Sequence, residues 1–444
     1  MSKFHQTSDA KVFHIPVPFL NRNAVLVYAP LSDMLFVAEQ SFSEELKKAL
    51  GGKSSNSQAN EIAADILQAE ILPAGNTSMR FSNLTILPTN RCNFNCQYCY
   101  SAQSRSTSHQ TISSEQLQQS LHLFLRRIDP GATSLAVTFY GGGEPLLAWE
   151  RIQETICFLE NNFNGKVYNK IITNGSLLDE KMVRYLMCHN TELTISYDIL
   201  PEMQNKYRGH FDLVTTMIKK CCDWGIVPEI NSVVTQDNVA RLKDMLEFAG
   251  RELPMVKYFH FEPVISQEMF PQPEKYTIFL KNFLDNFLNC QELLFNSDKE
   301  LSCSFSKKLV KNVSRFCPVD FVITPTGEIS GCPCISSSAV PGYDFYLYGQ
   351  RKNEEIDLDF EKFQQLLAFD NSCSPACNQC IARWNCAGGC LHRNRTMNEA
   401  CNKILCNFMR EFTIKGLLQK LDFQYRREYG KTLKELLHIA EETE

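Results

Sequence analysis

Short apolar runs alternate with amphipathic stretches from residue 83 to residue 264. The runs are rich in branched and aromatic residues, which favours strands, and the stretches between them repeat apolar residues with a helical period. Six β/α units in series predict an α/β fold with a parallel sheet, curled into a partial (β/α)6 TIM-like barrel. In such folds the chemistry lies in loops at the C-terminal ends of the strands. The expected strands are residues 83–89, 134–141, 168–174, 191–198, 228–235 and 256–264, and the expected helices include residues 113–128, 149–163 and 179–189.

Residues 1–80 show a different pattern, which predicts a small N-terminal α+β domain. Ser41 and Glu44 have the spacing of a capping box before a helix. So small a unit has little core of its own, which suits an appended recognition module; a purely structural cap is the alternative. The expected strands, separated by Pro and Asn turns, are residues 11–17, 24–30 and 33–39.

The distribution of cysteines separates the rest of the chain into further regions. Most of the 19 cysteines lie in residues 300–410, where strand signals are sparse and turns are frequent. We expect a cysteine-rich, metal-organised domain there, following a barrel domain at residues 81–299. In residues 411–444, apolar residues recur at helical spacing, which predicts a helical tail that covers the core.

Composition narrows the class of protein. A chain of 444 residues suggests several domains, and 44% apolar with 21% charged residues is ordinary for a globular protein. The net charge of −5 provides no basic field for nucleic acid, and no apolar run approaches the ~18 residues of a membrane span. The polar start carries no signal-peptide core, so we expect a cytoplasmic protein with no nucleic-acid or membrane partner. Clustered cysteines in such a chain favour metal or iron–sulfur ligation over disulfides.

The loop after the first barrel strand contains three cysteines. Cys92, Cys96 and Cys99 are spaced C-x3-C-x2-C, and Tyr98 directly precedes the last of them. Three thiolates can hold three irons of a 4Fe–4S cubane and leave the fourth iron open to another ligand. A zinc site completed by a distant ligand is the alternative.

This motif, in this position, resembles that of the radical S-adenosylmethionine (SAM) superfamily. The resemblance implies that the three cysteines ligate a 4Fe–4S cluster whose open iron binds SAM, and that Tyr98 lies against the adenine. Reductive cleavage of SAM then gives a 5′-deoxyadenosyl radical. The sequence GGEP after the second strand matches an element that contacts the SAM amino group; glycines permit close backbone approach, and a carboxylate suits an ammonium. The implied SAM contacts are Gly142, Gly143 and Glu144, with Thr173, Asn174, Ser196 and Asp198 as further candidates. Asn231 and His260 either line the cavity or have structural roles.

The second group of cysteines resembles the SPASM extension of radical SAM enzymes, which binds two auxiliary 4Fe–4S clusters. By this resemblance the outer cluster has the ligands Cys377, Cys380, Cys386 and Cys406, and the inner cluster has Cys317, Cys332 and Cys390.

The sequence offers two possibilities for the fourth iron of the inner cluster. The usual further cysteine upstream of Cys317 is missing, so Cys303 supplies it or the iron stays open for substrate. We expect Cys334 and Cys373 to be spare thiols or packing residues, with a ligand swap as the alternative. Cys401 competes weakly with Cys406 as an outer ligand. A zinc ribbon is the alternative for the whole segment.

The resemblance implies a peptide maturase. Such enzymes abstract hydrogen from a side chain of a ribosomally made precursor peptide and install a thioether or carbon–carbon cross-link or a related oxidation, with electrons from a flavodoxin- or ferredoxin-type donor. Residues 1–80 resemble a leader-recognition element, in which the leader peptide adds as a strand.

One alternative is a sulfatase-maturase-like enzyme acting on a folded protein, although Pro333 stands where those enzymes carry an Asp. The other is a zinc-stabilised binding module. The sequence nominates no catalytic acid or base.

Overall fold

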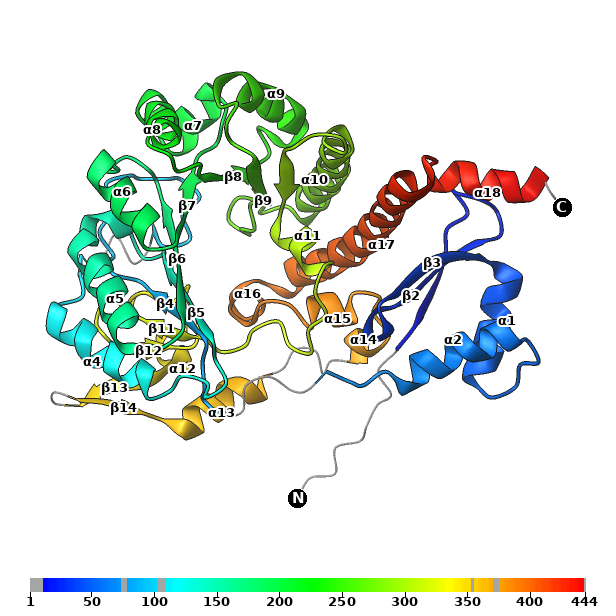
Figure 1. Cartoon of the computed structure of the whole chain (residues 1–444), viewed down its shortest axis with the longest axis horizontal. Coiled ribbons are helices and arrows are strands. Elements are labelled where there is room, and N and C mark those ends of the chain that lie inside the picture. The colour runs from blue at the N-terminus through cyan, green and yellow to red at the C-terminus, as the bar shows by residue number, and fades with distance from the viewer. Residues whose placement is uncertain (1–10, 73–77, 103–108, 353–354, 370–374, 443–444) are drawn as a thin grey trace.

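An eleven-stranded sheet forms the centre of the protein, with the strand order β10-β9-β8-β7-β6-β5-β4-β11-β12-β13-β14. The computed structural model describes residues 11–72, 78–102, 109–352, 355–369 and 375–442 (Figure 1). All neighbours from β10 to β11 pair in parallel, and the six strands expected from the sequence are confirmed. The parallel strands are β4 (Asn83–Ile86), β5 (Ser134–Phe139), β6 (Lys166–Thr173), β7 (Thr191–Ser196), β8 (Glu229–Val234), β9 (Tyr258–Pro263), β10 (Glu300–Ser302) and β11 (Phe321–Ile323).

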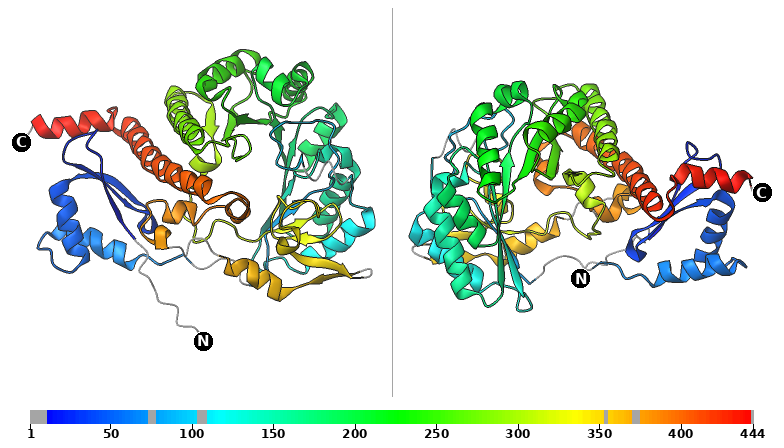
Figure 2. Two further views of the ribbon diagram at one scale, coloured as in Figure 1. Left: turned by 180° about the vertical axis from the view of Figure 1, so that it is seen from behind. Right: turned by 45° about the horizontal axis from the view of Figure 1, so that its top comes forward.

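Helices cover the outer face of the curved parallel sheet (Figures 1 and 2). On β9, Phe259 and Phe261 face these helices and are buried, whereas the alternating His260 and Glu262 face the barrel interior. The hydrophobic core therefore lies between sheet and helices, and the interior of the barrel is left for polar side chains. The covering helices are α4 (Ser114–Leu125), α5 (Trp149–Asn162), α6 (Glu180–Cys188), α7 (Pro201–Tyr207), α8 (Phe211–Asp223), α9 (Leu242–Glu252) and α10 (Pro273–Leu293), with 3-10 turns η2 (Pro145–Ala148) and η3 (Val239–Arg241).

The cysteine-rich segment continues the same sheet, which the sequence did not predict. After β11, the strands β12 (Ile329–Ser330), β13 (Leu347–Lys352) and β14 (Glu355–Leu358) form an antiparallel meander. Apart from Leu347 and Tyr348, β13 consists of Gly and polar residues, and β12 has only two residues, so these strands leave no clear apolar pattern. The segment also contains α11 (Ser304–Lys308), α12 (Tyr343–Tyr346), α13 (Phe360–Ala368), α14 (Pro375–Asn378), α15 (Arg383–Cys386) and α16 (Leu391–Thr396).

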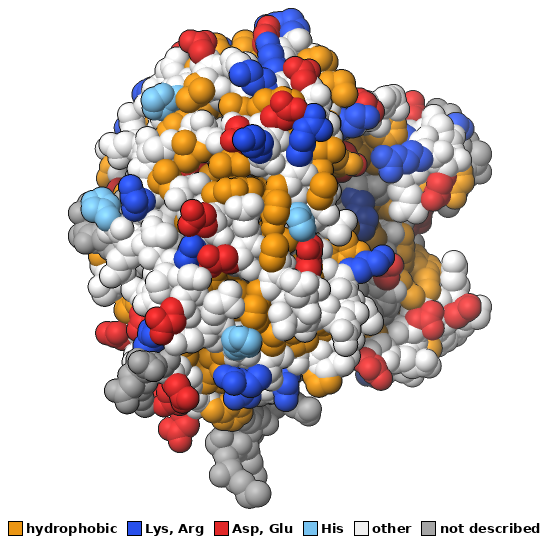
Figure 3. Space-filling view, turned by 60° about the vertical axis from the view of Figure 1, so that its left-hand side comes forward, with side chains coloured by type: hydrophobic (Ala, Val, Ile, Leu, Met, Phe, Trp, Pro, Cys, Tyr) orange, Lys and Arg blue, Asp and Glu red, His pale blue; other side chains and the backbone are white. Residues whose placement is uncertain are grey.

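Two helices close the chain, α17 (Glu399–Tyr429) and α18 (Leu433–Glu442). The helical tail is thus present, but the boundary expected at residue 410 falls inside α17. No helix in the described part of the chain is both long and apolar enough to cross a membrane. On the face in Figure 3, acidic and basic side chains are interspersed, as the small net charge suggests.

The N-terminal unit is a three-stranded antiparallel sheet with two helices: β1 (Phe13–Pro16), β2 (Ala24–Ala29), η1 (Pro30–Ser32), β3 (Met34–Glu39), α1 (Gln40–Leu50) and α2 (Ser57–Gln68). The predicted capping box at Ser41 is wrong: α1 begins at Gln40, directly after β3, and its N-cap, Glu39, makes no side-chain cap. Because the strand runs straight into the helix, no turn is left for Ser41 to cap.

The N-terminal sheet is buried on both faces. Val27 packs with residues of α1 and α2, whereas Leu26 and Tyr28 belong to a cluster with Trp384 and apolar residues of α17. The Tyr28 hydroxyl also donates a hydrogen bond to Asn385 Oδ1 at 3.0 Å. The unit therefore packs against the C-terminal part of the chain (Figure 2).

We predict that acid weakens the N-terminal unit through His14 on β1. His14 Nδ1 lies 2.8 Å from Ser43 Oγ, and its buried Nε2 has no hydrogen-bond partner among the described residues. Burial, with a smaller contribution from Lys47, lowers the pKa of His14 to about 4. Between that value and about 6.5, the unfolded state binds more protons, so the free energy of unfolding falls as the pH falls.

From pH 7 to pH 5 the loss should be on the order of 1–2 kcal/mol, measured by urea denaturation at each pH. His14→Gln should remove this pH dependence, and His109→Gln, at an exposed position, should retain it. An unchanged pH dependence in His14→Gln would rule out this origin.

Candidate active site

A cavity of about 400 Å³ opens at the C-terminal ends of the barrel strands. Cys92, Cys96 and Cys99, from the loop after β4, line it together with the Gly141–Glu144 turn after β5. The structure thus brings both sequence motifs to one site, at the edge of the sheet where the fold places chemistry.

Backbone hydrogen bonds join the two motifs. The Gly143 N–H donates to Thr89 O at 2.9 Å, and the Glu144 N–H donates to Arg91 O at 2.8 Å. A Cβ on Gly143 would lie 1.9 Å from Arg91 O, and Gly142 has a φ of +66°, which glycine adopts without strain. The glycines are therefore needed for the close contact between the turn and the cysteine loop.

Glu144 is held in one orientation by three donors. Its Oε1 accepts from Thr173 Oγ1 at 2.5 Å and from the Leu146 N–H at 3.1 Å, and its Oε2 accepts from the Asn174 N–H at 2.8 Å. Burial raises the pKa of Glu144, although these hydrogen bonds oppose the shift. The result is a fixed, nearly buried carboxylate in the cavity wall, suited to a cationic group.

Tyr98 belongs to a buried network with a charged pair. Its hydroxyl donates to Asp198 Oδ2 at 2.5 Å and accepts from Arg208 Nη1 at 3.2 Å. Asp198 does not line the cavity, unlike the other candidate SAM contacts, but it holds Tyr98 from behind. Burial raises the pKa of Asp198, and the Arg208 charge opposes this shift. Sequence reasoning missed Arg208, since nothing near α7 marks it as buried.

Two polar atoms of the cavity wall have no partner among the described residues. They are Arg208 Nε and Asn231 Oδ1, each buried within a residue that lines the cavity. A buried polar group without a partner costs free energy, so these atoms suit a ligand rich in polar groups. His260 pairs in register with Asn231 on the neighbouring strand, but of these two candidates only Asn231 lines the cavity.

Glu262, at the end of β9, is a second carboxylate in the wall that the sequence did not reveal. His260 Nε2 lies 3.2 Å from Glu262 Oε2, and Ser304 Oγ donates to Glu262 Oε1 at 2.6 Å. Burial would raise the pKa of Glu262, but the interactions with His260 and Ser304 outweigh it and lower the pKa. The carboxylate is therefore ionised at neutral pH and can accept a proton or bind a cation. The polar alternation of β9 was its only signal in the sequence.

The four cysteines assigned to the outer cluster line one small pocket between α11, α14, α15 and α17. Lys308 and Arg393 line the same pocket, and Arg410 Nε donates to Cys380 Sγ at 3.4 Å. Cations around four thiolates offset the negative charge of an iron–sulfur group, so the donor set fits one. Cys401 lines a different cavity, apart from these four.

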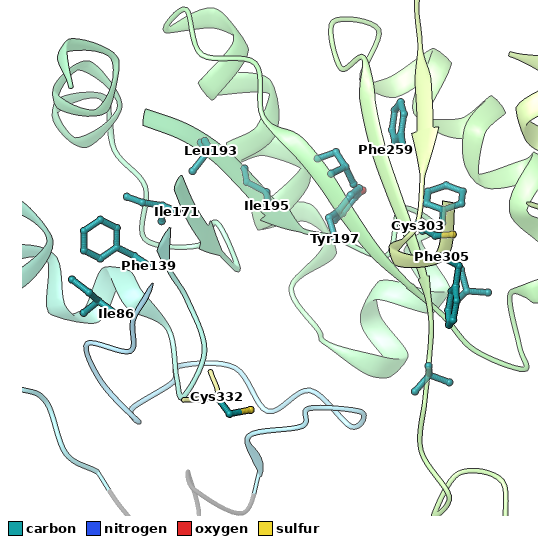
Figure 4. Packing of buried hydrophobic residues seen from close by; sticks show 14 of the residues in the cluster. Ile86, Phe139, Ile171, Leu193, Ile195, Tyr197, Phe259, Cys303, Phe305 and Cys332 are labelled. Carbon is teal, nitrogen blue, oxygen red and sulfur yellow. The ribbon is translucent and has the colours of Figure 1, made fainter. Parts of the chain in front are cut away.

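The cysteines assigned to the inner cluster also lie near one another. Cys332 interacts electrostatically with Cys317, which interacts in turn with Cys390. The structure does not bring Cys303 to them: its thiol accepts from the Ser306 N–H and caps α11, and Figure 4 shows it beside Phe305, well away from Cys332. Cys373 lies outside the described residues. No three Cys, His, Asp or Glu side chains within the described ranges converge tightly enough to hold a single metal ion.

Residues 86–249 match the sequence profile of the radical SAM superfamily. These residues form a radical SAM domain. The expected resemblance to SPASM-type radical SAM enzymes is supported, the chain is an enzyme, and the zinc-stabilised binding module is not supported. The family implies SAM and a 4Fe–4S cluster, and the cysteine loop, Glu144 and the polar cavity wall fit both.

Two curated relatives illustrate the range of the family. The chain is 27% identical to the radical SAM cyclopropyl synthase TigE of Paramaledivibacter caminithermalis, over 40% of this chain and only 39% of that protein. It is 21% identical to a cysteine-type anaerobic sulfatase-maturating enzyme of Clostridium perfringens, over 72% of this chain and 92% of that one.

Solved structures share the fold. The enzyme anSMEcpe with bound AdoMet and the Kp18Cys peptide aligns with a TM-score of 0.59 at 20% identity, over 76% of this chain and 97% of that one. Streptococcus suis SuiB bound to S-adenosylmethionine aligns with a TM-score of 0.50 at 14% identity, over 89% and 98%.

We predict that Gly143→Ala disrupts the site. The added Cβ must push the Arg91 carbonyl away, which separates the glycine turn from the cysteine loop. Iron bound after anaerobic reconstitution should fall by about four atoms per chain, as one four-iron cluster is lost. Gly250→Ala, on α9, meets nothing within 4 Å and serves as the matched control. Full iron content in Gly143→Ala would contradict the proposed role of this contact.

Proposed function

We propose that this radical SAM enzyme modifies a side chain of a ribosomally made precursor peptide, installing a thioether or carbon–carbon cross-link or a related oxidation. The observation that carries the proposal is the cavity that combines the three-cysteine loop, the fixed Glu144 carboxylate and a further wall with Glu262. Relatives named as a cyclopropyl synthase and as sulfatase-maturating enzymes, and a neighbour solved with a bound peptide, support a peptide substrate.

The residues that line the cavity can then be assigned roles in binding the cluster and SAM. Cys92, Cys96 and Cys99 would hold the 4Fe–4S cluster, and Glu144 would bind the SAM ammonium. Tyr98, fixed by Asp198 and Arg208, would contact the adenine. Further polar contacts would come from Gly142, Gly143, Thr173, Asn174 and Ser196, which all line the cavity. When bound, SAM and its cluster supply a 5′-deoxyadenosyl radical for hydrogen abstraction.

The second cysteine segment would hold two auxiliary 4Fe–4S clusters. Cys377, Cys380, Cys386 and Cys406 share one pocket with four basic side chains, which supports the outer cluster. Oxidation of a peptide after hydrogen abstraction releases one electron, and clusters next to the cavity suit its transfer. An external flavodoxin- or ferredoxin-type protein would supply the electron that starts the reaction.

The N-terminal unit would recognise the leader of the peptide. In its sheet β2 is central, so β1 and β3 each have one edge without a strand partner in the described part of the chain. An extended peptide can add to such an edge through backbone hydrogen bonds. The packing of this unit on α15 and α17 would place a bound leader beside the auxiliary-cluster segment.

A sulfatase-maturase-like activity on a folded protein is the second candidate, since the match to such enzymes covers 92% of the Clostridium perfringens protein. Pro333, directly after Cys332, provides no carboxylate there. Its carbonyl lies against Gly141 at the rim of the cavity. This difference favours the precursor peptide.

The deciding experiment uses the full chain, reconstituted anaerobically with iron and sulfide, then supplied with SAM and dithionite. The substrates are synthetic peptides encoded by short reading frames beside its gene. We expect 5′-deoxyadenosine and a loss of about two hydrogens from one peptide. Cys96→Ala should abolish both, and Cys188→Ala, on the exposed face of α6, should abolish neither. Modification of only a sulfatase-derived cysteine peptide would favour the alternative.

Glu144→Gln tests the SAM site separately. The amide keeps the shape but loses the charge, so one charge-assisted hydrogen bond weakens by roughly 1.5–3 kcal/mol. SAM affinity, measured by calorimetry on the reconstituted chain, should fall roughly 10- to 100-fold. The same change at the exposed Glu180 should leave affinity unchanged. Equal affinities for wild type and Glu144→Gln would remove Glu144 from the SAM contacts.

A further inference from the structure

A tight turn places a further cysteine, Cys334, next to Cys332, one of the cysteines assigned to the inner cluster. Cys332 O accepts a hydrogen bond from the Ile335 N–H at 3.1 Å, which closes a turn over Pro333 and Cys334. Proline at the second position of such a turn fixes its φ and favours the conformation. Within the turn, the side chains of Cys332 and Cys334 interact with each other. Two sulfurs of a C-x-C pair are therefore held together.

This pair lies between the other inner cysteines and the SAM cavity. Cys332 interacts with Cys317 on one side. On the other side both thiols of the pair interact with Tyr100 and Tyr140, which line the cavity. The Pro333 carbonyl, between the two cysteines, lies 3.5 Å from the position that a Cβ on Gly141 would take, and Gly141 also lines the cavity, so the turn adjoins the cavity.

The other positions that could supply a fourth ligand to the inner cluster make contacts elsewhere in the protein. Cys303 caps α11 and interacts with Glu262. Asn312, where the upstream cysteine of related enzymes is missing, donates from Nδ2 to Pro30 O at 2.6 Å and so joins the N-terminal unit. Some cysteines in the described part of the chain are assigned to none of the three clusters. Of these, Cys334 alone interacts with a cysteine assigned to the inner cluster.

We propose that Cys334 is the fourth protein ligand of the inner auxiliary 4Fe–4S cluster, on the iron that faces the SAM cavity. The proposal rests on the auxiliary clusters proposed above. Binding releases the thiol proton and replaces the contact with Cys332 by a sulfur–iron bond, and the Cys334 side chain is partly exposed. Four cysteines then close the cluster, so a substrate thiol cannot bind this iron, and the cluster serves to transfer electrons.

The test starts from a parent in which Cys92, Cys96 and Cys99 are all alanine, so that only auxiliary clusters contribute iron. After anaerobic reconstitution we expect about eight iron atoms per chain. Its electron paramagnetic resonance (EPR) spectrum, after dithionite reduction, should not change when 2-mercaptoethanol is added. With Cys334→Ala added, either the count falls to about seven, or the count holds and the thiol now changes the spectrum.

Cys334→Ser provides a second variant if the alanine variant loses its circular dichroism. An oxygen ligand should keep the iron and shift the EPR spectrum. Cys303→Ala and Cys188→Ala are controls that should match the parent in both measurements. The proposal is overturned if Cys334→Ala matches the parent, if the parent itself responds to the thiol, or if Cys303→Ala loses iron. A parent without any iron would instead overturn the auxiliary clusters as a whole.

Discussion

The site depends on one backbone contact, between the loop that carries the cysteines and the glycine turn that follows β5. Gly143 and Glu144 donate their N–H groups to the chain just before Cys92, at a separation that leaves no space for a side chain on Gly143. Since neither partner is a side chain, the contact is independent of charge and of pH. It fixes the distance between the sulfurs and the Glu144 carboxylate, which SAM would have to span.

Helices cover only the outer face of the barrel, so its interior is left for the cavity that this contact borders. Apolar residues of each strand pack outward, so the inward positions are free to be polar, as His260 and Glu262 are on β9. A barrel filled with apolar layers would have no room for a cavity of this size. Tyr100 illustrates the result: 56% of its surface is exposed, although protein surrounds the residue, because it faces the cavity.

Much of the fold and part of the site follow from the sequence, because short-range patterns report them. Periodicity predicted the six barrel strands, and the resemblance of two motifs to those of the radical SAM superfamily implied that Cys92 and Glu144 would share a site. Arg208 and Glu262 could not be predicted, since each matters only through partners that folding brings close, such as Tyr98 and His260. The same limit applies to Cys303: its position upstream of Cys317 makes it a candidate ligand in the sequence, but folding places its thiol at the start of α11.

The long helix α17 connects two regions that the sequence treats as separate. It begins beside the outer cysteines, contributes Cys406, and ends under the N-terminal sheet, where Leu417 and Leu421 pack with Leu26 and Trp384. A chain cut before β4 would uncover this apolar surface and leave it prone to aggregation. The first seventy residues are thus not an interchangeable attachment, and exchanging them between relatives would require the matching surface of α17 to be transferred as well.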